Sequence, residues 1–172
     1  MKNLAQLAEL RNKAEASILP NDTMIIYGEG GTGKTRYVAT IAESDLFDNI
    51  WWFDIGNSFE TIIRMAAEKQ LSAKAMAKIN VFQIEDTPLT PYGYETIAKI
   101  YCTNRDWKIC EKHGRCDCPL CTKDKVTEGW TPFNLFKLGK KDLVVVDDGS
   151  QFSDSCLAYQ CKGQDLGFKP GW

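Results

Sequence analysis

Residues 24–35 of this chain read Met-Ile-Ile-Tyr-Gly-Glu-Gly-Gly-Thr-Gly-Lys-Thr, and this stretch decides the expected fold. Its last eight residues, Gly28–Thr35, match the phosphate-binding loop pattern G-x-x-x-x-G-K-[S/T] at every specified position. The apolar run Met24–Tyr27 before the loop predicts a buried strand, and the apolar spacing of residues 36–42 after it predicts a helix. Strand, glycine-rich turn and helix form the context that this pattern requires.

The loop residues predict a site for ATP and Mg²⁺. Glycines let the backbone curl, so that successive N–H groups point toward phosphate oxygens. We expect Lys34 to reach the β- and γ-phosphates and the Thr35 hydroxyl to bind Mg²⁺. The whole loop is the expected nucleotide-binding segment: Gly28, Glu29, Gly30, Gly31, Thr32, Gly33, Lys34 and Thr35.

Composition sets the broad class of the protein. The chain has 172 residues, of which 44% are hydrophobic and 26% charged, as is typical of one globular domain with a core. Its net charge of −2 gives no global basic field toward nucleic acid. It contains no apolar stretch of the ~20 residues that span a bilayer. We therefore expect no membrane partner and a cytoplasmic protein. Residues 1–19 are expected to form an amphipathic helix, not a signal peptide.

Predicted strands and helices alternate along the chain. Strands are expected at residues 24–27, 49–55, 81–84 and 143–148, and helices after Ser58 and at residues 72–78 and 92–101. This alternation predicts an α/β fold with a parallel sheet. The expected core covers residues 20–101 and 140–172, and residues 102–139 are expected to be an insertion.

The last predicted strand carries a second part of the nucleotide site. Residues 143–148 read Leu-Val-Val-Val-Asp-Asp, an apolar strand ending in carboxylates. This Walker B pattern predicts that Asp147 lies beside Thr35 and holds Mg²⁺. Asp148 either polarises the attacking water or merely begins the following loop, and the sequence leaves both open.

Cysteines cluster in the predicted insertion. Five of the seven lie between Cys102 and Cys121, together with the single histidine. In a reducing compartment such a cluster favours a metal over disulfides, and Zn²⁺ takes four N or S ligands. We expect Cys110, Cys118 and Cys121 to bind structural zinc, with the fourth ligand either His113 or Cys116. The alternative is a set of free surface thiols.

Cations and two tryptophans flank the cysteines. The cations are Lys108, Lys112, Arg115, Lys123 and Lys125, with Trp107 and Trp130 at the edges. Such a set could bind single-stranded nucleic acid. Alternatively, it is a solvated rim with two aromatic rings packed under the zinc.

The order of Gly28–Thr35, Trp51-Trp52-Phe53-Asp54 and Leu143–Asp148 resembles the RecA-type P-loop ATPase core. It is most similar to the phage-encoded RecA-like nucleotide-binding proteins (AAA/RecA-like) of single-strand annealing recombination. The resemblance covers residues 20–155 and implies ATP hydrolysis coupled to DNA binding, and assembly into homo-oligomeric rings or filaments. It assigns phosphate and Mg²⁺ binding to the loop, and the Walker B carboxylate to Asp147.

Two features depart from this family pattern. RecA-type proteins usually carry a catalytic glutamate two residues after the aspartate that ends the second strand, and here that position is Gly56. Glu60, Asp148 or no residue at all would fill the role. Only 25 residues follow Asp147, so we expect the core to be incomplete at its C-terminus.

Two alternative functions remain open beside the ATPase. One is a non-hydrolysing, nucleotide-dependent module whose zinc insertion binds a protein partner, and the other is a small-molecule kinase.

Overall fold

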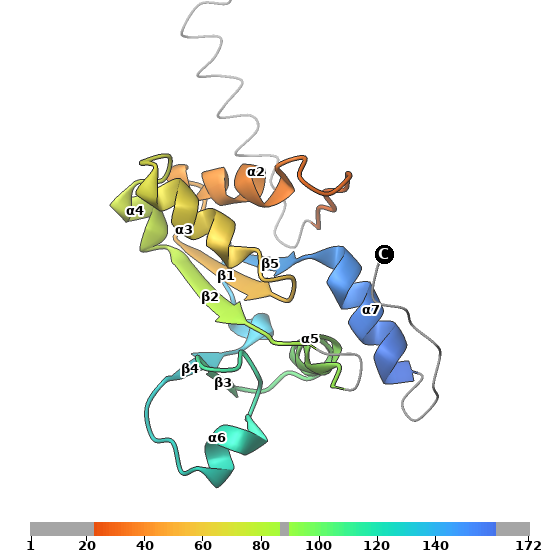
Figure 1. Ribbon diagram of the computed structural model, residues 1–172. Helices are drawn as coiled ribbons and strands as arrows, with labels where there is room; N and C mark the ends of the chain where they lie inside the picture. Colours follow the sequence, from red (N-terminus) through yellow and green to blue (C-terminus); the bar gives the residue numbers. More distant parts are fainter. Residues whose placement is uncertain (1–22, 87–89, 161–172) are drawn as a thin grey trace, which may run out of the picture.

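The computed structural model describes residues 23–86 and 90–160, and a three-stranded parallel sheet lies at its centre (Figure 1). The strands are β1 (Asn49–Asp54), β2 (Ile79–Gln83) and β5 (Asp142–Asp147), in the spatial order β2-β1-β5. Trp52 of β1 is in register with Val81 on one side and Val145 on the other. A central strand buried on both faces favours a continuous run of β-branched and aromatic residues, which the sequence of β1 supplies.

Three helices cover one face of the sheet (Figure 1). They are α2 (Lys34–Thr40), which continues as a 3₁₀ turn η1 (Ile41–Glu43), α3 (Phe59–Ala67) and α4 (Ala73–Met76). Ile50 and Trp52 of β1 pack here with Ala39, Ile62 and Met65. These contacts place the helix that follows the phosphate loop directly on the sheet.

The other face of β1 packs on α5 (Tyr92–Cys102), β3 (Trp107–Cys110), β4 (Trp130–Phe133), a 3₁₀ turn η2 (Leu135–Lys137) and α7 (Gly149–Gln160). Helix α6 (Pro119–Lys123) lies beyond β3 and β4, away from the sheet (Figure 1). Strands β3 and β4 form an antiparallel ribbon. Phe53 of β1 packs in one cluster with Phe133 of this ribbon and Ile100 of α5. The cysteine-bearing ribbon therefore belongs to the same packed unit as the sheet.

The strand predicted at residues 24–27 is absent, and this corrects the sequence prediction. Met24, Ile25 and Tyr27 are 66%, 83% and 92% exposed, and the segment has no regular structure. An apolar run becomes a strand only where a neighbouring strand accepts its hydrogen bonds. Within residues 23–86 and 90–160, β5 pairs with β1 alone, and no strand pairs with the segment. A mixed α/β fold with a small parallel sheet is thus present, but a full RecA-like core is not shown.

The other predicted elements of the described chain are present. Strands expected at residues 49–55, 81–84 and 143–148 correspond to β1, β2 and β5, and the helices expected after Ser58 and at residues 72–78 and 92–101 correspond to α3, α4 and α5. The helix predicted within residues 1–19, Cys161 and the C-terminal end of the predicted core lie outside the described residues.

Candidate functional site

The phosphate loop forms an open turn at the start of α2. Gly31 and Gly33 have φ angles of +77° and +85°, which favour glycine. A Cβ added at Gly30, Gly31 or Gly33 would meet no described atom within 4 Å. In the described chain, Thr32 is the one residue from Glu29 to Gly33 whose N–H donates to another backbone group, at 3.4 Å from the Glu29 carbonyl. The loop thus has space and N–H donors for an anionic group.

Lys34 folds back over this loop. Its Nζ donates to the carbonyl oxygens of Gly28 and Glu29, at 2.9 Å each. Both are exposed contacts, so the ammonium can exchange them for phosphate oxygens at little cost.

The two predicted halves of the nucleotide site meet. The Thr35 hydroxyl donates to Asp147 Oδ2 at 2.8 Å, although 112 residues separate them. Helix α2 packs on the sheet through Ala39, and β5 ends at Asp147, so the fold delivers both side chains to the carboxyl end of β5. A hydroxyl and a carboxylate side by side are oxygen ligands of the type that Mg²⁺ prefers.

Asp148 lies next to this pair and faces Gly56. A Cβ added at Gly56 would lie 3.1 Å from Asp148 Oδ2, so the Asp148 carboxylate occupies the space that a side chain at position 56 would need. The other oxygen, Oδ1, accepts the backbone N–H of Gln151 at 2.6 Å at the start of α7. Asp148 thus accepts a hydrogen bond at the start of α7 with one oxygen and directs the other toward Gly56.

The carboxylate of Asp54, by contrast, is fully committed to structure. It is 1% exposed and accepts from Ser58 N (2.7 Å), Ser58 Oγ (2.9 Å) and Phe59 N (3.0 Å). It therefore satisfies the first N–H groups of α3, a role that sequence reasoning missed. The sequence signal for this role was a serine four residues after an aspartate that ends a strand, since both residue types favour the start of a helix.

Four of the five predicted metal ligands come together. The ligand atoms of Cys110, His113, Cys118 and Cys121 all lie within 4.8 Å of one another. His113 Nδ1 is 3.8, 3.5 and 3.3 Å from the Sγ atoms of Cys110, Cys118 and Cys121, respectively. Strand β3 supplies the first cysteine and the start of α6 supplies the last two. Three sulfurs and one imidazole nitrogen match the ligand set of a structural zinc site.

Cys116, the other candidate for the fourth ligand, lies elsewhere. It forms an isolated bridge with Ile109, and its side chain packs in the hydrophobic core with Phe53 and Ile84. Burial raises the pKa of this thiol to about 12, so it is held as a neutral, packed sulfhydryl. The structure therefore places His113, and not Cys116, beside the three cysteines.

A glycine attaches the cysteine cluster to the sheet. Gly114 has a φ of +59°, and a Cβ there would lie 2.6 Å from the Gln83 carbonyl oxygen at the end of β2. Two backbone hydrogen bonds then link the ends of the three parallel strands, because Ile84 N donates to Asp54 O at 2.8 Å and Ile55 N donates to Asp147 O at 2.6 Å.

The two tryptophans at the edges of the cluster do not form an open stacking surface. Trp107 is 6% exposed and lies under the Arg105 guanidinium, whose carbon is 4.2 Å from the ring centroid. Trp130 packs against the cluster cysteines and donates its Nε1–H to Val126 O at 2.9 Å. Trp130 therefore packs beside the cysteines, whereas Trp107 packs in the core cluster that contains Phe53 and Phe133.

Comparisons with protein-family models, curated proteins and solved structures find no match to this chain. Among the described residues, no helix has the length and apolar character needed to cross a bilayer.

Proposed function

We propose that this protein binds ATP with Mg²⁺ through its phosphate loop and hydrolyses it, as a P-loop ATPase of phage DNA recombination or replication that binds single-stranded DNA. The observation that carries the nucleotide site is the 2.8 Å contact between Thr35 and Asp147, because it joins two motifs that are remote in sequence. The link to DNA and to homo-oligomeric rings or filaments rests on the resemblance of the motifs.

Each residue of the site has a defined part in this proposal. The loop N–H groups of residues 28–35 bind phosphate oxygens, and Lys34 leaves the loop carbonyls to meet the β- and γ-phosphates. Thr35 and Asp147 together orient Mg²⁺, which neutralises charge that develops on the phosphates.

Asp148 is the proposed catalytic carboxylate. Its Oδ2 faces the space above Gly56, where the related ATPases carry a glutamate side chain. A carboxylate supplied from β5 instead of β1 would orient the attacking water from a neighbouring strand end. Because Asp148 Oδ1 is held by the Gln151 N–H, the side chain has little freedom to approach the water. We therefore expect slow hydrolysis by the chain alone, since a positioned base commonly contributes 10²–10⁴-fold.

An arginine from a neighbouring subunit is the simplest source of further charge stabilisation. Three arginines of this chain are candidates: Arg64, Arg105 and Arg115. Arg105 forms an ion pair with Asp117 at 2.5 Å, and the Arg115 guanidinium carbon lies 3.4 Å from the Tyr92 ring centroid. Both are held outside the phosphate loop by these contacts. Arg64, on α3, is the remaining candidate within this chain.

We further propose that the Cys110–His113–Cys118–Cys121 cluster holds a structural Zn²⁺. The three cysteines of this site are buried, and Trp130 packs against them. Because this buried cluster is small, the loop around α6 would have few apolar contacts to stabilise it if no metal were bound. Coordination would instead tie β3 to α6 and stabilise a polar segment that has little core of its own.

A non-hydrolysing nucleotide-dependent module is the second candidate. Gly56 favours it, because the usual glutamate is missing, and so does the full commitment of Asp54 to α3. In this alternative the cysteine-bearing ribbon binds a protein partner when the loop is occupied by ATP.

Calorimetry and turnover assays separate these proposals. Lys34→Ala should weaken ATP binding at least tenfold, or ~1.4 kcal/mol, because it removes the cation aimed at the phosphates. Unchanged affinity would refute the phosphate-loop assignment.

ATP turnover, measured with and without single-stranded DNA, should be slow and stimulated by DNA if the protein is the proposed ATPase, and absent if it is the non-hydrolysing module. Asp148→Asn should remove turnover while leaving ATP affinity intact; retained turnover would exclude Asp148 as the base.

A further inference from the structure

Strand β5 has an open edge on the side away from β1. Within the described residues, 23–86 and 90–160, β5 pairs with β1 and with no other strand. All of its residues are half-buried, although the central run Leu143–Val146 is entirely apolar. A continuous apolar run is typical of a parallel strand that is covered on both faces and paired on both sides. The open edge of β5 therefore lacks a neighbour that its sequence is suited to receive.

The backbone direction identifies the groups at this edge. The carbonyl oxygens of Lys141, just before β5, and of Asp147, at its end, accept hydrogen bonds from backbone N–H groups at the two ends of β1, at 2.8 and 2.6 Å. Backbone groups alternate in direction along a strand, so Val145 also faces β1. The N–H and C=O groups of Val144 and Val146 consequently face the open edge.

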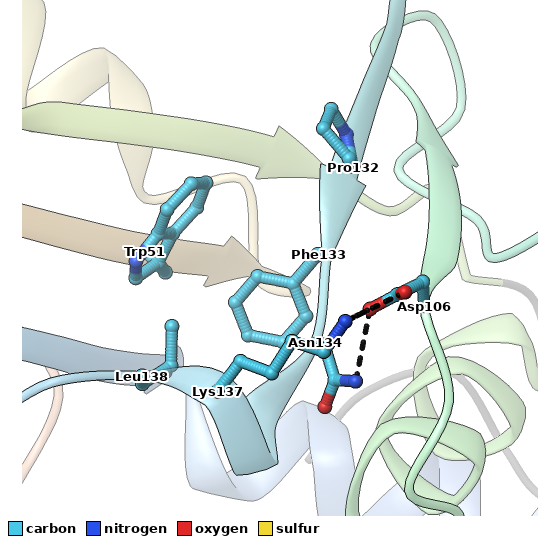
Figure 2. A pocket seen from close by; sticks show the side chains of 7 residues that line it. All are labelled: Trp51, Asp106, Pro132, Phe133, Asn134, Lys137 and Leu138. Atoms are coloured by element: carbon cyan, nitrogen blue, oxygen red, sulfur yellow. Dashed lines mark hydrogen bonds and ion pairs between the residues drawn. The ribbon is translucent and has the colours of Figure 1, made fainter.

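The faces of the sheet, in contrast, are already covered. Trp51 of β1 and Phe133 of β4 meet edge to face with ring centroids 5.2 Å apart, and together with Leu138 they line a cavity of about 210 Å³ between β1 and the ribbon (Figure 2). The apolar side chains of β5 pack in the two clusters on either face of the sheet. The part of β5 that remains without a neighbour is its edge.

The segment Met24–Tyr27 is an apolar run that also lacks a partner. Three of its four side chains are exposed, and Ile26 is only half-buried. In the part of the chain that the structure describes, no strand pairs with it. Four extended residues span about 13 Å, so the segment is long enough to cover most of the β5 edge.

The phosphate loop places the end of this segment beside the end of β5. The Thr35 hydroxyl contacts Asp147 at the carboxyl end of β5. The preceding residue, Lys34, holds the first two carbonyl oxygens of the loop, which directly follow the segment. A strand at residues 24–27 that extended along β5 would therefore finish at the same end of the sheet and run parallel to β5.

We infer that ATP binding releases residues 24–27 from Lys34 and lets them pair with the open edge of β5 as a further parallel strand. The inference rests on the ATP site proposed above. ATP favours the paired state because Lys34 exchanges the loop carbonyls for phosphate oxygens, and this exchange frees the backbone that precedes the loop. Ladder hydrogen bonds and burial of the apolar side chains then stabilise the added strand.

Amide hydrogen exchange, followed by NMR on the full chain with and without ATP and Mg²⁺, tests this inference. Without nucleotide, the Val144 and Val146 amides should exchange rapidly. With saturating ATP they should exchange roughly tenfold more slowly or less, because they gain hydrogen-bond partners. Val145 is the internal control, since its N–H faces β1 and should be protected in both states.

Proline substitutions provide the matched comparison. The double variant Ile25→Pro, Ile26→Pro lacks N–H groups that the added strand needs, so ATP should leave the exchange at the β5 edge rapid. Thr23→Pro lies outside the apolar run and should keep the wild-type slowing. Calorimetry should show that both variants bind ATP, the double variant more weakly, because ATP binding and strand pairing are linked.

The outcomes separate this inference from the proposed function. A wild-type chain that binds ATP while Val144 and Val146 still exchange rapidly would overturn the inference and leave the ATP site standing. Equal slowing in the double variant would exclude residues 24–27 as the added strand. Slowing that increases with protein concentration would assign the edge to a second copy of the chain and would also overturn the inference. A chain that binds no ATP by calorimetry would refute the proposed function itself.

Discussion

His113→Ala and Cys116→Ala change neighbouring positions, yet the structure predicts opposite consequences for zinc binding and for folding. The imidazole of His113 lies 3.3–3.8 Å from three cysteine sulfurs, whereas the thiol of Cys116 packs in the hydrophobic core beside Phe53. Removal of the imidazole should therefore weaken zinc binding. Removal of the thiol should lower the free energy of unfolding and leave zinc binding intact.

The two magnitudes follow from the geometry. Structural zinc sites bind with about 10–16 kcal/mol, so one ligand of four accounts for about 2.5–4 kcal/mol, or roughly a 10²–10³-fold rise in Kd. Cys116→Ala deletes a single buried heavy atom. By analogy with Ile→Val in protein cores, it should cost about 1 kcal/mol of unfolding free energy.

Competition with a chromogenic chelator measures the first quantity, and urea unfolding of the zinc-loaded protein measures the second. Cys102→Ala removes an exposed thiol and should change neither. The reasoning fails if Cys116→Ala releases zinc while His113→Ala retains wild-type affinity. That result would make Cys116 the ligand and would require the ribbon to rotate its buried face outward.

Three other substitutions test the packing around the site. Asp54→Ala leaves three hydrogen-bond donors at the start of α3 without their acceptor, and should lower the free energy of unfolding by about 2–4 kcal/mol. Asp48→Ala, which removes an exposed ion pair with Lys141, should change it by less than about 0.5 kcal/mol, and equal effects of the two substitutions in urea titrations would contradict the assigned role of Asp54. Gly114→Ala should destabilise the chain more than Gly129→Ala. Both glycines have positive φ angles, but only at Gly114 would an added Cβ lie 2.6 Å from a backbone oxygen, that of Gln83. Similar melting temperatures for the two variants would argue against the close contact between Gly114 and the end of β2. Asp147→Asn should weaken the dependence of ATP affinity on Mg²⁺, because it removes the charged metal ligand and leaves Thr35, and calorimetry that shows the wild-type Mg²⁺ dependence would exclude Asp147 from that role.

Local patterns predicted most of the fold. The aromatic and β-branched runs of β1 and β5 predicted parallel strands, of which β1 is buried and β5 is half-buried. The apolar face predicted for α3 comprised Ile62, Ile63, Met65 and Ala66; Ile62 and Met65 are buried, whereas Ile63 is exposed. These predictions succeeded because strand and helix periods are properties of neighbouring residues. The apolar run at residues 24–27 looked equally strand-like but lacks a pairing partner among the described residues.

The candidate sites divide in the same way. The sequence alone determined the phosphate-loop motif, the carboxylates at the end of β5 and a set of five possible zinc ligands, because residue type and short spacing define each of these. The Walker B pattern also predicted that Asp147 lies beside Thr35, and the structure contains this contact. Only the tertiary structure decided that Asp148 fills the space over Gly56 and that Trp51 lines a cavity. The tertiary structure also distinguishes the two candidates for the fourth ligand, because the bridge to Ile109 places the Cys116 thiol in the core and leaves His113 beside the three cysteines. Spacing counts residues along the chain, but the direction of a side chain is set by the strand or helix that packs against it.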